Sequence, residues 1–130
     1  MRILIVDDSP VARHFVRRVL QVSGLPVEEF LEAGDGLAAI EVLRTSPVDV
    51  MIADINMPKM SGEDLIRYLD AQDELRDLAV VVVSTDSTAV RVQRLMEYGA
   101  RGYVSKPFSP ETLRAEIERV LEAQREHSRQ

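Results

Sequence analysis

The sequence has 130 residues, the usual length of one compact domain, and 45% of them are hydrophobic, which is enough for a single core. Its net charge of −6 and pI near 4.9 argue against a surface that binds nucleic acid, and the absence of cysteine excludes disulfides and thiolate metal sites. The N-terminal segment MRILIVDDSP contains too short an apolar run for a signal peptide or a membrane span, so we predict a cytoplasmic protein.

Five apolar runs, separated by segments with helical periodicity, predict five β-strands. They are residues 2–6 (RILIV), 27–33 (VEEFLEA), 48–53 (VDVMIA), 79–83 (AVVVV) and 102–105 (GYVS). The first, third and fourth runs are continuously apolar, which is typical of strands that are covered on both faces. Because strands alternate with helices, we predict an α/β protein with a parallel sheet, right-handed crossovers and helices on both faces of the sheet.

Apolar residues spaced three or four apart predict five helices between and after these strands. The residues expected on their buried faces, helix by helix, are Ala12, Phe15, Val16, Val19 and Leu20; Leu37, Ile40 and Leu43; Leu65, Ile66 and Leu69; Val92, Leu95 and Met96; and Leu113, Ile117, Val120 and Leu121. The hydroxyls suited to cap helix N-termini belong to Ser9, Ser61, Ser87 and Ser109, and the glycines suited to end helices are Gly24 and Gly99. We predict one domain over residues 1–125, followed by a frayed tail over residues 126–130.

Chemically active side chains follow four of the predicted strands. Asp7 and Asp8 follow the first strand, Asp54 the third, Ser84 the fourth and Lys106 the fifth. The carboxyl ends of parallel strands meet at one edge of a sheet, so these groups are expected to converge there. Two carboxylates about 4 Å apart repel by on the order of 4 kcal/mol at an effective dielectric of 20. The cluster therefore needs protonation or a cation, and an all-oxygen site suits Mg²⁺.

Each of these residues also has an ordinary structural explanation. A single aspartate at the end of a strand is more often a solvated turn residue or a helix cap than part of a functional site. Acids at two strand ends, a hydroxyl at a third and a lysine at a fourth are a combination that favours a functional site.

Four motifs make the sequence resemble the receiver domain of two-component response regulators, and its plan is most similar to the single-domain chemotaxis type. They are VDD (6–8), ADINMPKMSG (53–62), VVVST (81–85) and GYVSKPF (102–108). The resemblance covers about residues 2–124. It implies a doubly wound, flavodoxin-like sheet of five parallel strands in the order 2-1-3-4-5, with five helices. It also implies a signalling switch that catalyses only its own phosphotransfer and dephosphorylation, and is otherwise not an enzyme.

The resemblance assigns a phosphorylation site and a metal site. Asp54 would accept a phosphoryl group from a histidine kinase, or from a small donor such as acetyl phosphate. Asp8, Asp54 and the backbone carbonyl of Asn56 would bind Mg²⁺ directly, and Asp7 would act through bound water. Lys106 would contact the phosphoryl oxygens.

The resemblance also assigns residues to switching and to dephosphorylation. Ser84 would donate a hydrogen bond to the phosphoryl group, and Tyr103 would change rotamer as Ser84 moves. Asn56 and Asp86 occupy positions that tune dephosphorylation in this family. Thr85 stands where relatives usually carry alanine or glycine, and its larger side chain is expected to narrow the path of attacking water or of a phosphatase.

The resemblance implies protein partners. They are a sensor histidine kinase or phosphotransfer protein, and a downstream target that contacts the surface of the fourth helix, fifth strand and fifth helix. Neither nucleic acid nor a membrane is expected as a direct partner. Phosphorylation-dependent homodimerisation stays open, as do the pathway and a larger regulator from which the domain is excised.

Three other functions compete with this one. The main alternative is an aspartate-nucleophile phosphatase of the haloacid dehalogenase type, which also uses a carboxylate, Mg²⁺, a hydroxyl and a lysine. Such enzymes carry the nucleophile in an Asp-x-Asp motif after the first strand, where this sequence has Asp7-Asp8-Ser9. A binding module that is never phosphorylated, and a flavin carrier that would need a phosphate-binding first loop, are less compatible with the motifs.

Overall fold

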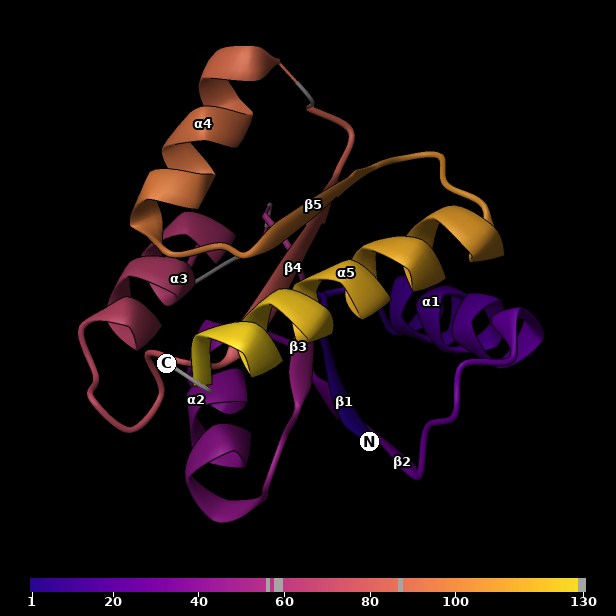
Figure 1. The fold of residues 1–130 in the computed structure, drawn as a ribbon, viewed down its shortest axis with the longest axis horizontal. Coiled ribbons are helices and arrows are strands. Elements are labelled where there is room, and N and C mark those ends of the chain that lie inside the picture. Colours follow the sequence, from indigo (N-terminus) through magenta and orange to yellow (C-terminus); the bar gives the residue numbers. More distant parts are fainter. Residues whose placement is uncertain (56, 58–59, 87, 129–130) are drawn as a thin grey trace.

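A computed structural model describes residues 1–55, 57, 60–86 and 88–128 (Figure 1). Within these residues the sheet has five parallel strands in the order β2-β1-β3-β4-β5. The strands are β1 (Arg2–Val6), β2 (Glu29–Ala33), β3 (Val50–Asp54), β4 (Ala79–Ser84) and β5 (Gly102–Ser105). The predicted fold class and strand order are confirmed. Strands β2 and β3 begin two residues later than predicted. The prediction starts these strands at Val27 and Val48, which are apolar because they pack against the core, but they lie outside the strands.

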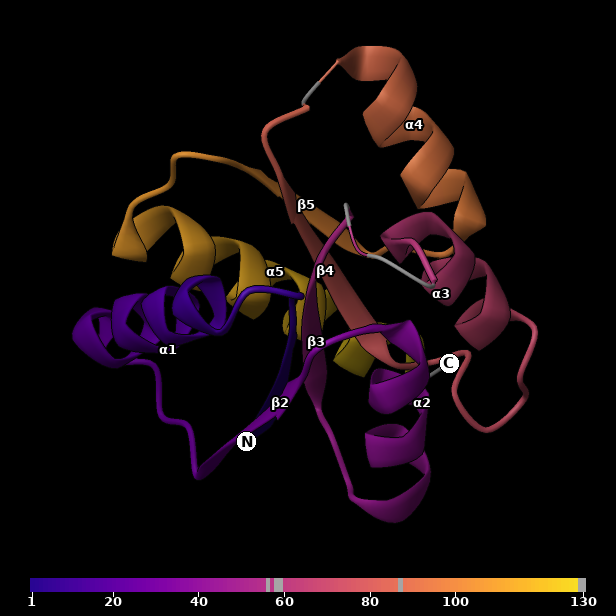
Figure 2. The same ribbon diagram turned by 180° about the vertical axis from the view of Figure 1, so that it is seen from behind.

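Helices cover both faces of the sheet. Their bounds in the described residues are α1 (Pro10–Ser23), α2 (Gly36–Thr45), α3 (Gly62–Asp70), α4 (Ala89–Tyr98) and α5 (Pro110–Ser128). Figures 1 and 2 show α1 and α5 together on one side of the sheet, and α2, α3 and α4 on the other. Because α5 continues to Ser128, residues 126–128 extend that helix, and fraying of the last residues stays a prediction.

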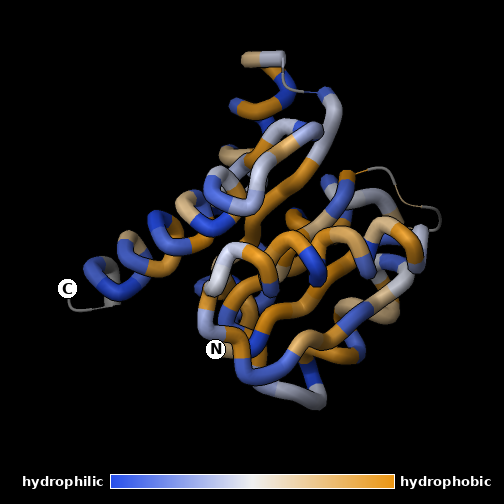
Figure 3. The backbone as a smooth tube through the Cα atoms, turned by 90° about the vertical axis from the view of Figure 1, so that its right-hand side faces the viewer, coloured by the Kyte–Doolittle hydropathy of each residue, from blue (hydrophilic) through white to orange (hydrophobic). Residues whose placement is uncertain are grey.

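The hydrophobic core has two layers, one on each side of the sheet. Side chains alternate between the two faces of a strand, so Leu4 and Met51 pack under α2, α3 and α4, whereas Ile3 and Ile52 pack under α1 and α5. All four side chains are at most 2% exposed. Figure 3 shows hydrophobic colour along the central strands and mixed colour along the helices, as a sheet buried on both faces requires. In the described part of the chain, no helix is long and apolar enough to span a bilayer.

Two predicted core residues, Phe15 and Leu37, lie on the surface, where each is 56% exposed. The buried residues of α1 are Val16, Val19 and Leu20. At 100° per residue, Phe15 is about 90° around the helix from the centre of that stripe, so its ring leaves the core. Leu37 similarly flanks the buried face of α2.

Local signals define most helix ends as predicted. Ser9, Ser61 and Ser109 each accept a hydrogen bond from the backbone N–H three residues later. The prediction that Ser87 caps the fourth helix is wrong. Helix α4 begins at Ala89, so the hydroxyl that reaches its first turn belongs to Thr88, which accepts from the N–H of Arg91. Ser87 itself lies outside the described residues.

Helix α4 is anchored differently from the other helices. Among its residues only Leu95 is buried, and Val92 and Met96 of its predicted buried face are half-buried. An ion pair joins it to α3, with 2.9 Å between Nε of Arg91 and Oε1 of Glu63. Figures 1 and 2 show α4 beside α3 at the edge of the molecule.

Replacing Gly62 with alanine is expected to destabilise the protein. A Cβ at this position would lie 2.7 Å from the Cα of Ile55 and 2.8 Å from the carbonyl oxygen of Asp54, so the β3–α3 backbone would have to move. We expect the free energy of unfolding to fall by about 1–3 kcal/mol, measured by urea denaturation. Gly36→Ala is the matched control.

Gly36 is also the first residue of its helix, and its new Cβ would lie 2.8 Å from the flexible side chain of Met60. Because a side chain can move aside, the cost of Gly36→Ala should be smaller. Equal losses for the two variants would contradict the close backbone approach at Gly62.

Candidate functional site

Three carboxylates converge where β1 and β3 end. Oxygens of Asp7, Asp8 and Asp54 all lie within 4.8 Å of one another. Asp7 is buried, Asp54 is half-buried and Asp8 is exposed. The strand register explains the convergence, because Val6 of β1 pairs with Ala53 of β3, directly before the acids in each strand.

A lysine and a hydroxyl complete this edge of the sheet. The Nζ atom of Lys106 lies 4.0 Å from Oδ2 of Asp54. The backbone N–H of Lys106 donates to the carbonyl oxygen of Ser84 at 2.8 Å, which extends the pairing of β4 with β5 up to the lysine. The Lys106–Pro107 peptide bond is cis. Among the described residues, this edge thus holds the Lys106 ammonium next to three carboxylates.

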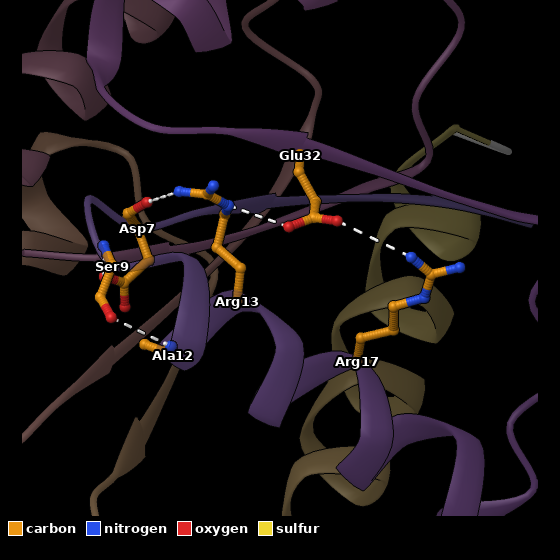
Figure 4. Close-up of polar contacts among 6 residues, drawn as sticks. All are labelled: Asp7, Ser9, Ala12, Arg13, Arg17 and Glu32. Carbon is orange, nitrogen blue, oxygen red and sulfur yellow. Dashed lines mark hydrogen bonds and ion pairs between the residues drawn. The ribbon is translucent and has the colours of Figure 1, made fainter.

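Hydrogen bonds hold the polar groups of Asp7 in the loop after β1, and Figure 4 shows part of this network. The backbone N–H of Asp7 donates to the carbonyl of Ala33 at 3.1 Å, and the N–H of Ser9 donates to the Asp7 carboxylate at 2.9 Å. Burial raises the pKa of Asp7 above its ordinary value of 3.8; the bond from Ser9 lowers that pKa, and the charge of Asp54 raises it. An ionised Asp7 is therefore costly in the absence of a cation.

A chain of hydrogen bonds leads from the site to the surface. The Ser84 hydroxyl, which is 2% exposed, accepts from the N–H of Asp86 at 3.1 Å. The carbonyl of Asp86 in turn accepts from the Tyr103 hydroxyl. The backbone N–H of Tyr103 donates to the Glu116 carboxylate at 2.8 Å. The side chain of Arg119 lowers the pKa of Glu116 by a direct hydrogen bond, so this acceptor stays ionised.

A cavity of about 310 Å³ opens beside the acids. Thr85 lines it together with Asp7 and Lys106, and its other lining residues are Ala12, Phe15, Val16, Pro107 and Phe108. The rings of Phe15 and Phe108 are in contact, with centroids 6.0 Å apart. Thr85 thus lines the same cavity as Asp7 of the acid cluster and Lys106.

The structure brings together most of the residues that the sequence singles out. Asp7, Asp8, Asp54 and Lys106 share one edge, and Thr85 borders it. Ser84, Asp86 and Tyr103 form the connected chain described above. Asn56 lies outside the described residues.

Sequence analysis gave no role to two residues that support the site. Arg13 donates to the carbonyl of Asp7, and Glu116 accepts from the N–H of Tyr103. Both lie on helices, one turn or more from any motif. The sequence would have indicated them only if it showed which charged helix residues face the end of a strand. That orientation is known only once the packing of the helices against the sheet is known.

Comparison with known proteins identifies the family of the chain. A family model described as the response regulator receiver domain matches residues 3–118. The chain belongs to the response regulator receiver family. The chemotaxis protein CheY-3 of Vibrio cholerae serotype O1 is 34% identical over 122 residues, which cover 94% of this chain and 92% of that protein. The chemotaxis protein CheY of Pseudomonas aeruginosa is also 34% identical over 122 residues, covering 94% and 97%.

Solved structures agree with this assignment. The chemotaxis response regulator CheY4 of Vibrio cholerae superposes with a TM-score of 0.81 at 33% identity, covering 92% of this chain and 97% of that one. The chain is therefore a receiver domain of the two-component, chemotaxis-like kind, a family of signalling switches.

Asp7→Asn is expected to stabilise the protein at neutral pH when no divalent ion is present. Because the folded-state pKa of Asp7 is raised, its contribution to stability is fully present below about pH 3.8 and is lost as the pH rises through the raised value. The amide avoids that loss, so the free energy of unfolding at about pH 7 should rise by on the order of 1 kcal/mol. Urea unfolding in a chelator measures it.

The gain from Asp7→Asn should vanish at about pH 3, where the acid is protonated in both folded and unfolded chains. Asp8→Asn is the control, because Asp8 is exposed and its charge costs less in water. A gain for Asp7→Asn that is the same at both pH values would contradict burial as the cause.

Proposed function

We propose that Asp54 is the phosphoryl acceptor of this receiver domain. The observation that carries the proposal is the position of its carboxylate between Lys106, 4.0 Å away, and the acids Asp7 and Asp8, within 4.8 Å. Phosphoryl transfer depends mainly on positioning and on neutralising charge, and this arrangement offers both. The donor would be a sensor histidine kinase, a phosphotransfer protein or a small acyl phosphate.

The same carboxylates fit a divalent cation. A cluster of carboxylate oxygens that is partly exposed to solvent suits Mg²⁺, because this ion prefers oxygen ligands and retains several of its waters in proteins. Asp8 and Asp54 would bind the ion directly, and Asp7 through water. Asn56 would add its backbone carbonyl, a part of the proposal that concerns a residue outside the described ones. When bound, Mg²⁺ would neutralise charge on the phosphoryl oxygens.

The side chains have distinct parts in the transfer. A carboxylate oxygen of Asp54 forms a bond to phosphorus while the bond from phosphorus to the donor breaks, and the leaving group keeps that electron pair. The Lys106 ammonium lies where it can contact the phosphoryl oxygens. The Ser84 hydroxyl accepts from Asp86 through its oxygen, and its hydrogen serves as the donor to the phosphoryl group.

The signal would leave the site through Ser84. When the Ser84 hydroxyl moves toward the phosphoryl group, its hydrogen bond with the N–H of Asp86 would change. The carbonyl of Asp86 accepts from the Tyr103 hydroxyl, so Tyr103 would respond. Tyr103 belongs to β5, so its rotamer would alter the surface formed by α4, β5 and α5, where a downstream target or a second copy would bind. Such a switch requires two conformations of similar free energy, which the phosphoryl group biases.

The position of Lys106 supports the switch over the phosphatase. Lys106 forms an ion pair with Asp54 of β3, whereas a haloacid dehalogenase-type enzyme would use an aspartate after β1 as nucleophile. We further propose that residues 1–125 form the functional unit, with 126–130 as its tail, and that the protein acts in the cytoplasm. It would turn over only its own phosphoryl group.

Asp54→Asn is expected to abolish phosphorylation. With Mg²⁺ and acetyl phosphate, the wild type should gain the mass of one phosphoryl group, and the variant should gain none, because an amide is a poor nucleophile. Intact-protein mass spectrometry gives the readout. Many turnovers per protein with phosphorylated metabolites, or equal labelling of both proteins, would favour the phosphatase or another acceptor.

Thr85→Ala is expected to shorten the lifetime of the phosphorylated protein. Thr85 borders the cavity beside Asp7 and Lys106, so removing its hydroxyl and methyl groups should widen the path of attacking water. Decay of the phosphoryl group after donor removal should become a few-fold faster. Thr88→Ala is the control, since Thr88 is also exposed but caps α4 outside this cavity. Unchanged or slower decay in Thr85→Ala would refute the access argument.

A further inference from the structure

Arg13 joins the acidic loop after β1 to the edge strand β2. Its Nη1 atom donates to the carbonyl oxygen of Asp7 at 2.6 Å, and its Nε atom donates to the Glu32 carboxylate at 2.9 Å. Figure 4 shows the guanidinium between these two acceptors. The Arg13 side chain is only 17% exposed; its bond to Asp7 is partly buried, whereas its bond to Glu32 lies at the surface.

The Asp7 carbonyl controls more than its own residue. It belongs to the planar peptide group that links Asp7 to Asp8, so the direction of this carbonyl also fixes the position of the Asp8 backbone N–H and Cα. The N–H of Asp7 is already held by Ala33, and its carboxylate by Ser9. Arg13 holds the remaining polar group, and with it the backbone between the two acids.

Strand β2 provides the fixed point for this arrangement. Glu32 pairs with Ile5 and Ala33 with Val6 in the sheet. Asp7 is thus held by two neighbouring residues of β2: directly by the carbonyl of Ala33, and through Arg13 by Glu32. Glu32 is itself held by a second cation, with 3.7 Å between its Oε2 and Nη1 of Arg17. The guanidinium of Arg17 stacks on the ring of Phe30, 5.4 Å from its centroid.

Glu32 also offsets part of the charge of Arg13. An unpaired guanidinium close to the acid cluster would repel any cation that the cluster binds. The Glu32 carboxylate, which Arg13 shares with Arg17, reduces this repulsion while Arg13 donates its hydrogen bond to Asp7.

We propose that Arg13, held by Glu32, is a positioning residue for the divalent-cation site, because it fixes the Asp7–Asp8 peptide from which two of the three carboxylates project. This inference rests on the proposed function, since it assumes that the acids bind a cation. A residue with a purely structural role would lower stability when it is replaced. A positioning residue should lower the affinity for the cation in a protein that remains folded.

The test is a titration of the full chain with Mg²⁺ alone, measured by isothermal titration calorimetry, for the wild type and four variants. Arg13→Ala should weaken Mg²⁺ binding by about tenfold, the usual effect of losing a group that orients a metal ligand. Arg13→Lys should restore part of the affinity, because an ammonium can reach one acceptor but lacks the planar fork that joins both. Arg17→Ala is the matched control.

Arg17 lies one turn further along α1 and shares Glu32, but its recorded contacts are with Glu32 and Phe30 and not with Asp7. Its removal should change the Kd for Mg²⁺ by less than about twofold. Glu32→Gln separates geometry from charge. It should weaken binding at low salt and recover at high salt, whereas the defect of Arg13→Ala should persist at both.

Circular dichroism establishes that each variant is folded before titration. Wild-type affinity in folded Arg13→Ala, or an equal loss in Arg17→Ala, would overturn the inference and leave the proposed function intact. If Arg13→Ala does not fold, Arg13→Lys against Arg17→Lys decides: a loss confined to Arg13→Lys supports the inference, and equal affinities overturn it. A wild type that binds no Mg²⁺ would overturn both the inference and the proposed metal site.

Discussion

Mutual repulsion among three carboxylates is the constraint around which this end of the fold is organised. Carboxylate oxygens of Asp7, Asp8 and Asp54 lie within 4.8 Å of one another, and the ammonium of Lys106 is 4.0 Å from Asp54. Such a cluster is stable only because the sheet imposes it: β1 and β3 are central strands with cores on both sides, and their ends cannot drift apart. The stability of the apolar layers thus maintains a concentration of negative charge that the binding of a cation can relieve.

The same arrangement separates the reacting groups from the groups that report on them. Asp7 and Asp8 lie in the loop after β1 and Asp54 is the last residue of β3, whereas Ser84, Asp86 and Tyr103 belong to β4, its following loop and β5. The two sets meet only at the sheet edge. From Ser84 at this edge, hydrogen bonds run through Asp86 to Tyr103, and under the proposed function this is the route of the signal.

The sequence is most informative about features that depend on local pattern. Apolar runs locate the five strands, and because each active side chain follows a strand, knowledge of a parallel sheet suffices to predict that the acids meet. The exposure of Phe15 was beyond reach because it depends on how α1 is rotated against α5 and the sheet. Arg13 was missed because its role requires Glu32 and Ala33 to stand beside β1, a relation set by long-range pairing. Thr88 and Ser87 differ as caps by one residue, which is within the usual uncertainty of helix boundaries.

Helix α4 buries only Leu95 and is tied to α3 by the pair of Arg91 and Glu63. A helix with so little apolar area under it belongs to the low-stability part of a domain, where local opening requires the least free energy. Under the proposed function, the output surface thus includes a helix whose local displacement requires little free energy. Evolution could retune the signalling threshold of this domain by adding or removing a methyl group beneath α4, leaving the chemistry at the sheet edge untouched.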